Sequence, residues 1–509
     1  MRGSIAMHTR FLCRAALLAA VAVVAGPALA AGFTLPEDHR ALTKTTSFAE
    51  MESFLRSVEG TGGVTVSVEG RSAAGRPLYV VHLGGGGERP WRILLYAQQH
   101  GDEVSGKDAL LYLVRDIARD PGLLPPDVDL WLVPMVNPDG AEADTRVNSA
   151  GVDLNRDHIV LEQPETQALH LLARRLRPAV AVDCHEFGRD ARGWLERGWL
   201  KWPDITMDSL NNPLLDPAVR ASALRFLGTA AAAEARAGHP FLRYWVGGVP
   251  PDEEQRHSAP DIDGGLNSLG MYGGQSFIIE AAARHAEAGD RDRDLGNRVD
   301  AYLALFRAIL QGDGHRAEDL AAIEQARRRP LPAFLPTNYL WVNPDAAVTE
   351  FPVVEIASGR VVEIPTANLM TAMAVKRTVP TPRGYAIPAP AAAQFRLLLE
   401  RHGIPFEQLG AARPVEAETC TLVRVEEEFD EVYSRYEGRQ IVSRGAPAAV
   451  ELAAGSLWVP LEGEAALRAA LVLEPASLYG LYQYPSYRGL VGADGAVPVL
   501  RVVRETGGP

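Results

Sequence analysis

Short apolar runs alternate with longer segments of helical spacing between residues 63 and 310, and this alternation constrains the fold most. Residues 92–97 (RILLYA) form one apolar run, and residues 108–118 follow with apolar positions three and four apart. Strands that alternate with helices require a sheet covered by those helices. The pattern therefore predicts an α/β domain with a mixed, mostly parallel sheet and helices on both faces.

The same criteria divide the rest of this region into further elements. Residues 64–68 and 78–83 alternate like an antiparallel pair of strands. The other predicted strands are residues 128–136, 178–184 and 276–281, and the other predicted helices are residues 166–176, 217–237 and 298–310. We expect this α/β domain to span residues 32–330.

The composition and the periodicity of the sequence change after about residue 330. Residues 329–345 and 378–390 are rich in proline, and short valine-rich segments replace the periodic helices. Residues 391–402 are the exception, with a helix-like pattern. A chain of 509 residues is also too long for one core. We therefore expect a second, mainly β domain over residues 335–509.

The first 31 residues have the pattern of a secretory signal peptide. Arg2, Arg10 and Arg14 precede a short apolar run, residues 15–26, and small residues follow it. We expect cleavage near Ala30 or Ala31 and a secreted or periplasmic protein. No later stretch reaches the roughly 20 apolar residues of a membrane helix, so no membrane span is expected in the mature chain.

The net charge disfavours polyanionic partners. The formal net charge is -13, and loss of the three leader arginines makes it more negative still. An acidic chain is unsuited to nucleic acid or anionic membranes. Cys184 and Cys420 remain after the leader and lie in different predicted domains, so no disulfide framework is expected.

Four polar segments interrupt the apolar pattern after predicted strands. They are His100-Gly101-Asp102-Glu103, Asn137-Pro138-Asp139-Gly140, residues 146–156, and Asp183-Cys184-His185-Glu186. A catalytic zinc takes three protein ligands and keeps one position open. His100 and Glu103 can both turn toward one ion, although a loop histidine and a helix N-terminal glutamate give the same pattern.

The other three segments are also open to more than one interpretation. Asn137 to Gly140 is locally a turn. Residues 146–156 hold two arginines and two asparagines, which suit a carboxylate but also a solvated loop. His185 stands at a strand end, where α/β sheets bind ligands. Glu186 is a rival catalytic base, but adjacent strand residues point to opposite faces.

The order of these motifs resembles that of the zinc metallocarboxypeptidases of the carboxypeptidase A type. The motifs are, in order, HGDE, NPDG, R-x-N-x-x-G-V-D-L-N-R, D-x-H and an apolar strand ending in Glu280. The resemblance covers about residues 60–285. It implies the fold of that family and one Zn²⁺ ion per chain, bound by His100, Glu103 and His185. The carboxypeptidase ligand set of two histidines and a glutamate is itself a standard example of a catalytic zinc site.

The resemblance also implies roles for five further residues. Asp153 matches the carboxylate that orients the first histidine ligand, and Glu280 matches the catalytic carboxylate. Arg146 matches the arginine that polarises the scissile carbonyl. Asn155 and Arg156 match the pair that binds the terminal carboxylate of the substrate.

The sequence departs from the family pattern in one important place. Peptide-cleaving members usually have a tyrosine about twenty residues before the catalytic glutamate, and none stands there. Tyr272 and Tyr244 are the candidates to replace it. Residues 382–388, 401–404 and 473–477 are similar to an accessory domain of some large bacterial members, for which we expect a packing role.

These matches imply a zinc-dependent amide hydrolase that removes C-terminal residues from peptides. A cell-wall peptide amidase or carboxypeptidase and a deacylase of N-acyl amino acids are alternatives with the same zinc site. A binding protein without catalysis is a third alternative, disfavoured by the intact ligands and Glu280.

Overall fold

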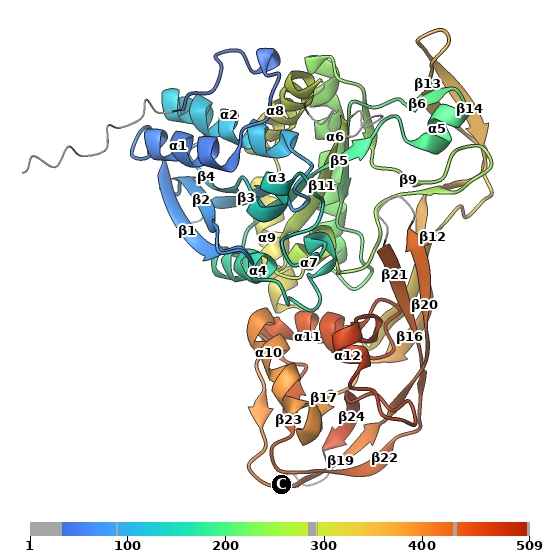
Figure 1. Ribbon diagram of the computed structural model, residues 1–509. Helices are drawn as coiled ribbons and strands as arrows, with labels where there is room; N and C mark the ends of the chain where they lie inside the picture. The colour runs from blue at the N-terminus through green and yellow to red at the C-terminus, as the bar shows by residue number, and fades with distance from the viewer. Residues whose placement is uncertain (1–32, 88–89, 284–291, 293, 431–434, 506–509) are drawn as a thin grey trace, which may run out of the picture.

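The computed structural model divides into a larger N-terminal part and a C-terminal part (Figure 1). It describes residues 33–87, 90–283, 292, 294–430 and 435–505. The predicted signal peptide, residues 1–31, lies outside the described residues. Within those residues, no helix is long and apolar enough to cross a membrane.

An eight-stranded sheet forms the centre of the N-terminal part. Its strands, in spatial order, are β1 (Thr65–Arg71), β2 (Pro77–Gly84), β4 (Val128–Val133), β3 (Trp91–Ala97), β5 (Val180–Gly188), β11 (Gln275–Ala283), β7 (Ile205–Ser209) and β8 (Phe241–Arg243). β4, β3, β5 and β11 run parallel, and β1, β2 and β7 pair antiparallel with their inner neighbours. The predicted mixed sheet is therefore confirmed.

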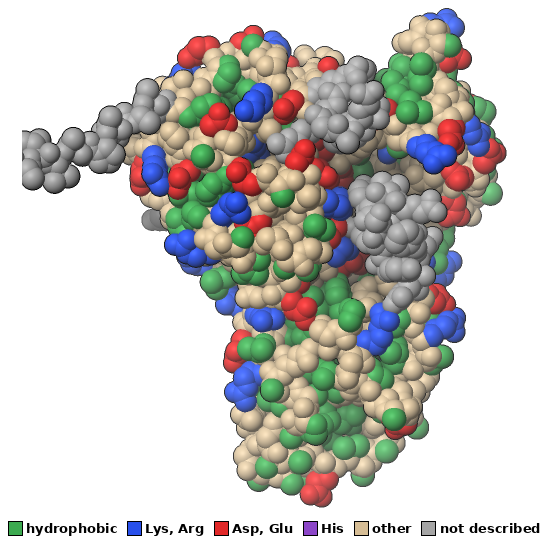
Figure 2. Space-filling model, viewed as in Figure 1, with side chains coloured by type: hydrophobic (Ala, Val, Ile, Leu, Met, Phe, Trp, Pro, Cys, Tyr) green, Lys and Arg blue, Asp and Glu red, His purple; other side chains and the backbone are tan. Residues whose placement is uncertain are grey.

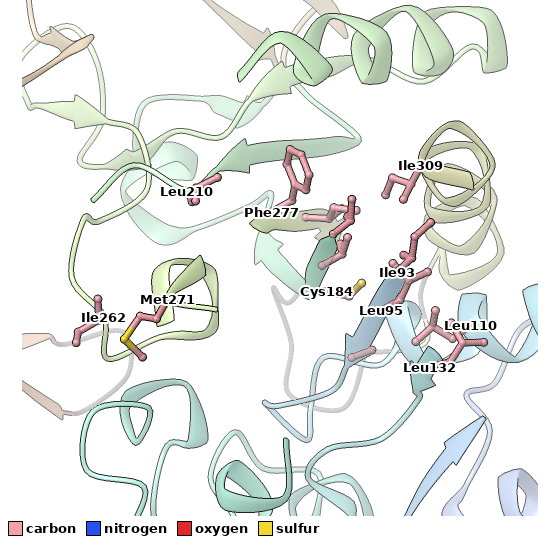
Figure 3. Close-up of a cluster of buried hydrophobic side chains, with 14 of the residues drawn as sticks. Ile93, Leu95, Leu110, Leu132, Cys184, Leu210, Ile262, Met271, Phe277 and Ile309 are labelled. Atoms are coloured by element: carbon pink, nitrogen blue, oxygen red, sulfur yellow. The ribbon is translucent and has the colours of Figure 1, made fainter. Parts of the chain in front are cut away.

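The side chains of the sheet alternate between two hydrophobic cores. Ile93 and Leu95 belong to the larger core (Figure 3). Leu94 and Tyr96 belong to a smaller core on the other face. Helices of the larger core include α2 (Ser105–Arg119), α6 (Pro217–Ala237) and α8 (Leu295–Gln311). Helices of the smaller core are α4 (Pro164–Leu176) and α7 (Gly265–Gly270). Helices thus cover both faces of the sheet, as predicted.

Two central strands are longer than predicted. The expected strand over 178–184 continues as β5 to Gly188, and the strand over 276–281 continues as β11 to Ala283. The polar residues His185 and Glu186 follow the first predicted strand and Ala282 and Ala283 follow the second, and β5 and β11 remain paired through these positions. His185 and Glu280 consequently lie inside strands, where backbone pairing fixes their positions.

The C-terminal part is built on a six-stranded sheet with three helices beside it. The strands, in spatial order, are β18 (Glu407–Gln408), β23 (Leu457–Pro460), β17 (Gly384–Ile387), β24 (Leu500–Glu505), β19 (Arg413–Glu418) and β22 (Ala448–Leu452). The helices are α10 (Ala392–His402), α11 (Ala466–Leu473) and α12 (Pro485–Arg488), and they lie toward the N-terminal part (Figure 1). α10 confirms the predicted helix at 391–402 and contacts α4.

A segment from the C-terminal half returns to the N-terminal part. β13 (Thr349–Glu355) pairs with β14 (Arg360–Thr366) and with β6 (Trp199–Lys201). β15 (Leu369–Met370) pairs with β10 (Gln255–Arg256), which also pairs with β9 (Val246–Gly247). These pairings bring residues 349–370 beside segments that precede them by more than a hundred positions.

The remaining elements connect or flank these layers. β12 (Phe334–Val342) pairs with β16 (Ala372–Pro380), and β20 (Cys420–Asp430) pairs with β21 (Arg435–Arg444). The remaining helices are α1 (Phe48–Val58), α3 (Pro138–Ala143), α5 (Arg192–Glu196) and α9 (Arg316–Arg328). Acidic and basic side chains are interspersed on the face that Figure 2 shows.

Candidate metal centre and active site

Three predicted ligands converge at the carboxyl end of the central strands. His100 and Glu103 lie in the loop between β3 and α2, and His185 lies in β5. Glu103 Oε1 is 2.7 Å from His100 Nδ1, and Glu103 Oε2 is 2.8 Å from His185 Nδ1. All three side chains are buried, and their ligand atoms lie within 4.8 Å of one another, so the group could hold a metal ion.

The donor atoms suit zinc. The Nδ1 atoms of His100 and His185 face each other at 3.1 Å. Bonds of about 2.0–2.1 Å in tetrahedral geometry separate ligand atoms by about 3.3 Å, so a small outward shift accommodates the ion. Two imidazoles and a carboxylate form a donor set typical of catalytic zinc, with a fourth position left for water or substrate.

Carboxylates fix the orientation of both imidazoles. Asp153 Oδ1 is 3.2 Å from His100 Nε2, and Asp183 Oδ1 is 2.9 Å from His185 Nε2. Contacts of this kind leave the Nδ1 atoms directed at the ion and raise their basicity. Burial lowers the pKa of His185, but the charges of Asp183 and Glu103 outweigh it, and the pKa lies well above its ordinary value. The sequence prediction gave no role to Asp183, although it is part of the D-x-H motif.

Arg146 lies against the same group. Its Nε donates to Asp153 Oδ2 at 2.9 Å, and its Nη1 is 3.1 Å from His100 Nδ1. The guanidinium is therefore directed at the metal side of the ligands.

Two glycines allow the ligand loop to approach its neighbour. A Cβ on Gly101 would lie 2.0 Å from the carbonyl carbon of Gly140, which excludes any larger side chain. Asn137 caps α3 by accepting a hydrogen bond from Gly140 N at 2.9 Å, and its Nδ2 donates to Gln99 O at 3.1 Å. The NPDG turn thus supports the loop that carries His100.

Glu280 is the carboxylate beside the metal ligands. It is the register partner of His185 in the parallel pair of β11 with β5, so the two side chains project from the same face. Burial raises the pKa of Glu280 to about 7. Within the described part of the chain, no hydrogen-bond or ion-pair partner of this carboxylate is present. A buried carboxylate without a partner beside a ligand cluster is a functional-site candidate.

Glu186 occupies the opposite face of β5. Its Oε1 accepts hydrogen bonds from Ser105 N at 2.7 Å and from Arg298 Nη1 at 2.5 Å. These partners belong to α2 and α8, on the side of the larger core. Glu186 is therefore directed away from the ligand atoms, as strand alternation predicts.

The Asn155 and Arg156 pair lies next to the ligands. Asn155 Nδ2 is 3.2 Å from His185 Nε2, and Asn155 Oδ1 accepts from Gly265 N at 2.8 Å. Arg156 is partly exposed, and its Nε is 3.8 Å from Asp263 Oδ2. The sequence interpretation did not include Asp263, because nothing in its surroundings marks it as a site residue.

The two candidate tyrosines occupy different places. Tyr272 is buried, and its hydroxyl is 2.9 Å from Nδ1 of His170 in α4. Tyr244 lines a separate pocket together with Phe187 and Thr206.

A tyrosine from the C-terminal part contacts the site. Tyr484 donates its hydroxyl hydrogen to the carbonyl oxygen of Arg156 at 2.9 Å. His402, at the end of α10, is 2.7 Å from the carbonyl oxygen of Ile159 through its Nε2. The C-terminal part therefore supports the backbone at Arg156 and Ile159 through these two hydrogen bonds.

Comparison with known proteins agrees with this geometry. The family model described as zinc carboxypeptidase matches residues 51–173. Carboxypeptidase 2 of Trichophyton tonsurans is 25% identical over 430 residues, covering 78% of this chain and 76% of the relative. Carboxypeptidase SOL1 of Arabidopsis thaliana is 32% identical over 138 residues, covering 23% of this chain and 28% of the relative.

Among solved structures, carboxypeptidase A of Helicoverpa armigera superposes with a TM-score of 0.43 at 18% identity, covering 55% of this chain and 75% of that one. The matched stretch, residues 51–173, contains His100 and Glu103, and the fold then brings His185 to them. The family model, the relatives and the ligand cluster together show that this chain is similar to the zinc carboxypeptidases.

Proposed function

We propose that this protein is a secreted zinc metallocarboxypeptidase that removes residues from the C-termini of peptides. The observation that supports it most is the position of Glu280. This buried carboxylate has no partner in the described residues and is in register with His185, one of three side chains that could hold a metal. A metal-assisted hydrolase needs a base at this place.

Each side chain has a defined part in the proposed reaction. A bound zinc ion would supply a Lewis acid and lower the pKa of water to about 7. Glu280 accepts the proton of the attacking water and later delivers it to the leaving amine. Arg146 stabilises negative charge on the carbonyl oxygen. Asp153 and Asp183 keep the imidazoles of the ligands in place.

Asn155 and Arg156 are the proposed contacts of the substrate's terminal carboxylate. Arginine binds carboxylates through two parallel N–H donors, and an asparagine amide adds a neutral donor. Binding the carboxylate there places the last amide of the peptide at the metal. This arrangement distinguishes a carboxypeptidase from an endopeptidase.

The function is tested by digesting a mixture of synthetic peptides and reading the products by mass spectrometry. We expect loss of single C-terminal residues with zinc present and no products with a chelator. Restored cleavage on adding zinc back would separate metal loss from unfolding. Internal cleavage, or cleavage that persists in chelator with zinc absent by elemental analysis, would refute the proposal.

The proposed location outside the cytoplasm rests on the sequence of residues 1–31. Mass spectrometry of the N-terminus of the exported protein is the direct test. A mature chain that begins near Gly32 is expected, and a cytoplasmic protein that keeps Arg10 and Arg14 would contradict it.

A further inference from the structure

An aromatic pocket with one lysine lies next to Glu280. Its lining includes Phe187, Trp194, Lys201, Thr206, Trp245 and Phe351, and it encloses about 350 Å³ with its open mouth included. No role in the function proposed above involves any of these side chains. The pocket is separate from the three metal ligands but shares a face of the sheet with them.

The sheet register relates the pocket to the metal ligands. His185 pairs with Glu280, Glu280 pairs with Thr206, and Thr206 pairs with Leu242, another wall of the pocket. Side chains that are partners across adjacent strands project from the same face, with strands about 4.8 Å apart. The pocket therefore begins one strand beyond Glu280.

Three distant segments build its walls. The indole of Trp194 and the ring of Phe351 have centroids 6.1 Å apart, and those of Trp245 and Phe351 are 6.2 Å apart. Lys201 stands in β6, where its register partner is Val353 of β13, and its carbonyl accepts from Arg189 Nε at 3.0 Å. Backbone pairing thus fixes the position of the Lys201 backbone at the edge of the pocket.

The ammonium group of Lys201 faces aromatic rings. Its Nζ is 5.2 Å from the centroid of Phe187 and 5.8 Å from that of Trp194, distances of cation–π contacts. In the part of the chain that the structure describes, Lys201 Nζ has no hydrogen-bond or ion-pair partner. Burial lowers the pKa of Lys201 to about 8, against the charge of Glu280, so the group is mainly cationic at neutral pH.

The direction of β5 indicates which part of a substrate reaches the pocket. Asp183, His185 and Phe187 alternate onto one face of the strand, spanning roughly 13 Å. Asn155 lies at the Asp183 end, because Gln99 Nε2 contacts both Asp183 Oδ2, at 2.8 Å, and Asn155 Oδ1. The pocket lies at the Phe187 end. The metal ligands are between them.

We propose that this pocket binds an acidic side chain on the amino-terminal side of the scissile bond, with Lys201 as the cation that selects it. The inference rests on the proposed carboxypeptidase function, in which Asn155 and Arg156 bind the other end of the substrate. Aromatic walls pack against the methylenes of the side chain and exclude water, which strengthens an ion pair with Lys201. A glutamate as the penultimate residue is the expected ligand.

The test uses two peptides that differ only in a penultimate glutamate or glutamine, cleaved by the zinc-loaded full chain. We expect kcat/KM to be about tenfold or more higher for the glutamate peptide, as for a partly desolvated charged contact. Lys201→Met should remove this preference by slowing only the glutamate peptide. Lys201→Arg, which keeps the charge, should retain it.

Lys376→Met is the matched control, because Lys376 is exposed on β16 away from the pocket, and it should leave the preference unchanged. Equal cleavage of both peptides by the unaltered protein would overturn the pocket proposal while leaving the carboxypeptidase function intact. So would an equal loss on both peptides in Lys201→Met. Absence of cleavage of either peptide by the zinc-loaded protein would instead refute the function on which the inference rests.

Discussion

Buried charged side chains occur in both parts of the molecule, but they are arranged differently. In the N-terminal part, Glu280 is buried without a partner among the described residues. In the C-terminal part, Arg501 contacts Glu418 and donates from Nε to Glu474 Oε2 at 3.0 Å. Tyr385 also donates to Glu474 Oε2 at 2.9 Å. A buried carboxylate without a partner beside the metal ligands indicates a reactive group, whereas the paired charges around Arg501 join strands and a helix of the C-terminal part.

This comparison explains the C-terminal motifs. Tyr385 belongs to residues 382–388 and Glu474 to residues 473–477, and the two meet at Arg501. In the third motif, His402 contacts the carbonyl oxygen of Ile159 in the N-terminal part. The motifs thus hold the C-terminal part together and attach it to the N-terminal part at Ile159, contacts of the kind expected for a packing role.

The largest expected effect is that of Glu280→Gln. The amide keeps the shape of the side chain but cannot accept a proton, so kcat should fall by about 10²–10⁴-fold with zinc still bound. Steady-state kinetics and elemental analysis of the same preparation check both parts.

Glu186→Gln is the matched control for this prediction. Glu186 faces Ser105 and Arg298 on the other side of the strand, so the substitution should lower thermal stability and leave kcat within a few-fold. Near-normal activity in Glu280→Gln with a large loss in Glu186→Gln would reverse the assignment.

Arg501→Met tests the compensated cluster. Removing one partner of a buried ion pair typically costs about 3–5 kcal/mol, because the remaining carboxylates stay buried. Denaturant unfolding should show this loss in the free energy of unfolding, while kcat/KM of the protein that remains folded should not change. A loss of activity without a loss of stability would mean that the cluster is not a packing device.

Tyr484→Phe should have the smallest effect. It removes one neutral hydrogen bond to the carbonyl of Arg156, worth about 1 kcal/mol, which corresponds to a several-fold rise in KM for free-acid peptides. The KM for C-terminally amidated peptides should not change. Equal effects on both substrates would indicate that Tyr484 does not position Arg156.

The sequence predicted the sheet from local patterns, and it predicted the metal ligands through the resemblance to the zinc metallocarboxypeptidases. The alternating apolar runs gave the strands, and motif order related His100 and Glu103 to His185 across more than eighty residues. Strand alternation also separated Glu186 from His185. The predicted ends of β5 and β11 were wrong, because pairing between the two strands continues β5 through His185 and Glu186 and β11 through Ala282 and Ala283.

The pocket around Lys201 could not be predicted from the sequence. Its walls come from Phe187, Trp245 and Phe351, which are brought together only when β13 pairs with β6. Tyr484 is separated from Arg156 by 328 positions, and no local pattern connects them. Contacts between distant segments that share no motif could therefore be identified only from the structure.

The most direct test of the account compares one peptide with its C-terminal amide as substrates of the zinc-loaded protein. Because Asn155 and Arg156 are proposed to bind the free carboxylate, amidation should lower kcat/KM by about 100-fold, since each tenfold corresponds to about 1.4 kcal/mol. Arg156→Ala should produce a similar loss on the free acid and almost none on the amide. Equal cleavage of the acid and the amide by the unaltered protein would contradict the carboxypeptidase assignment, although a zinc hydrolase would remain.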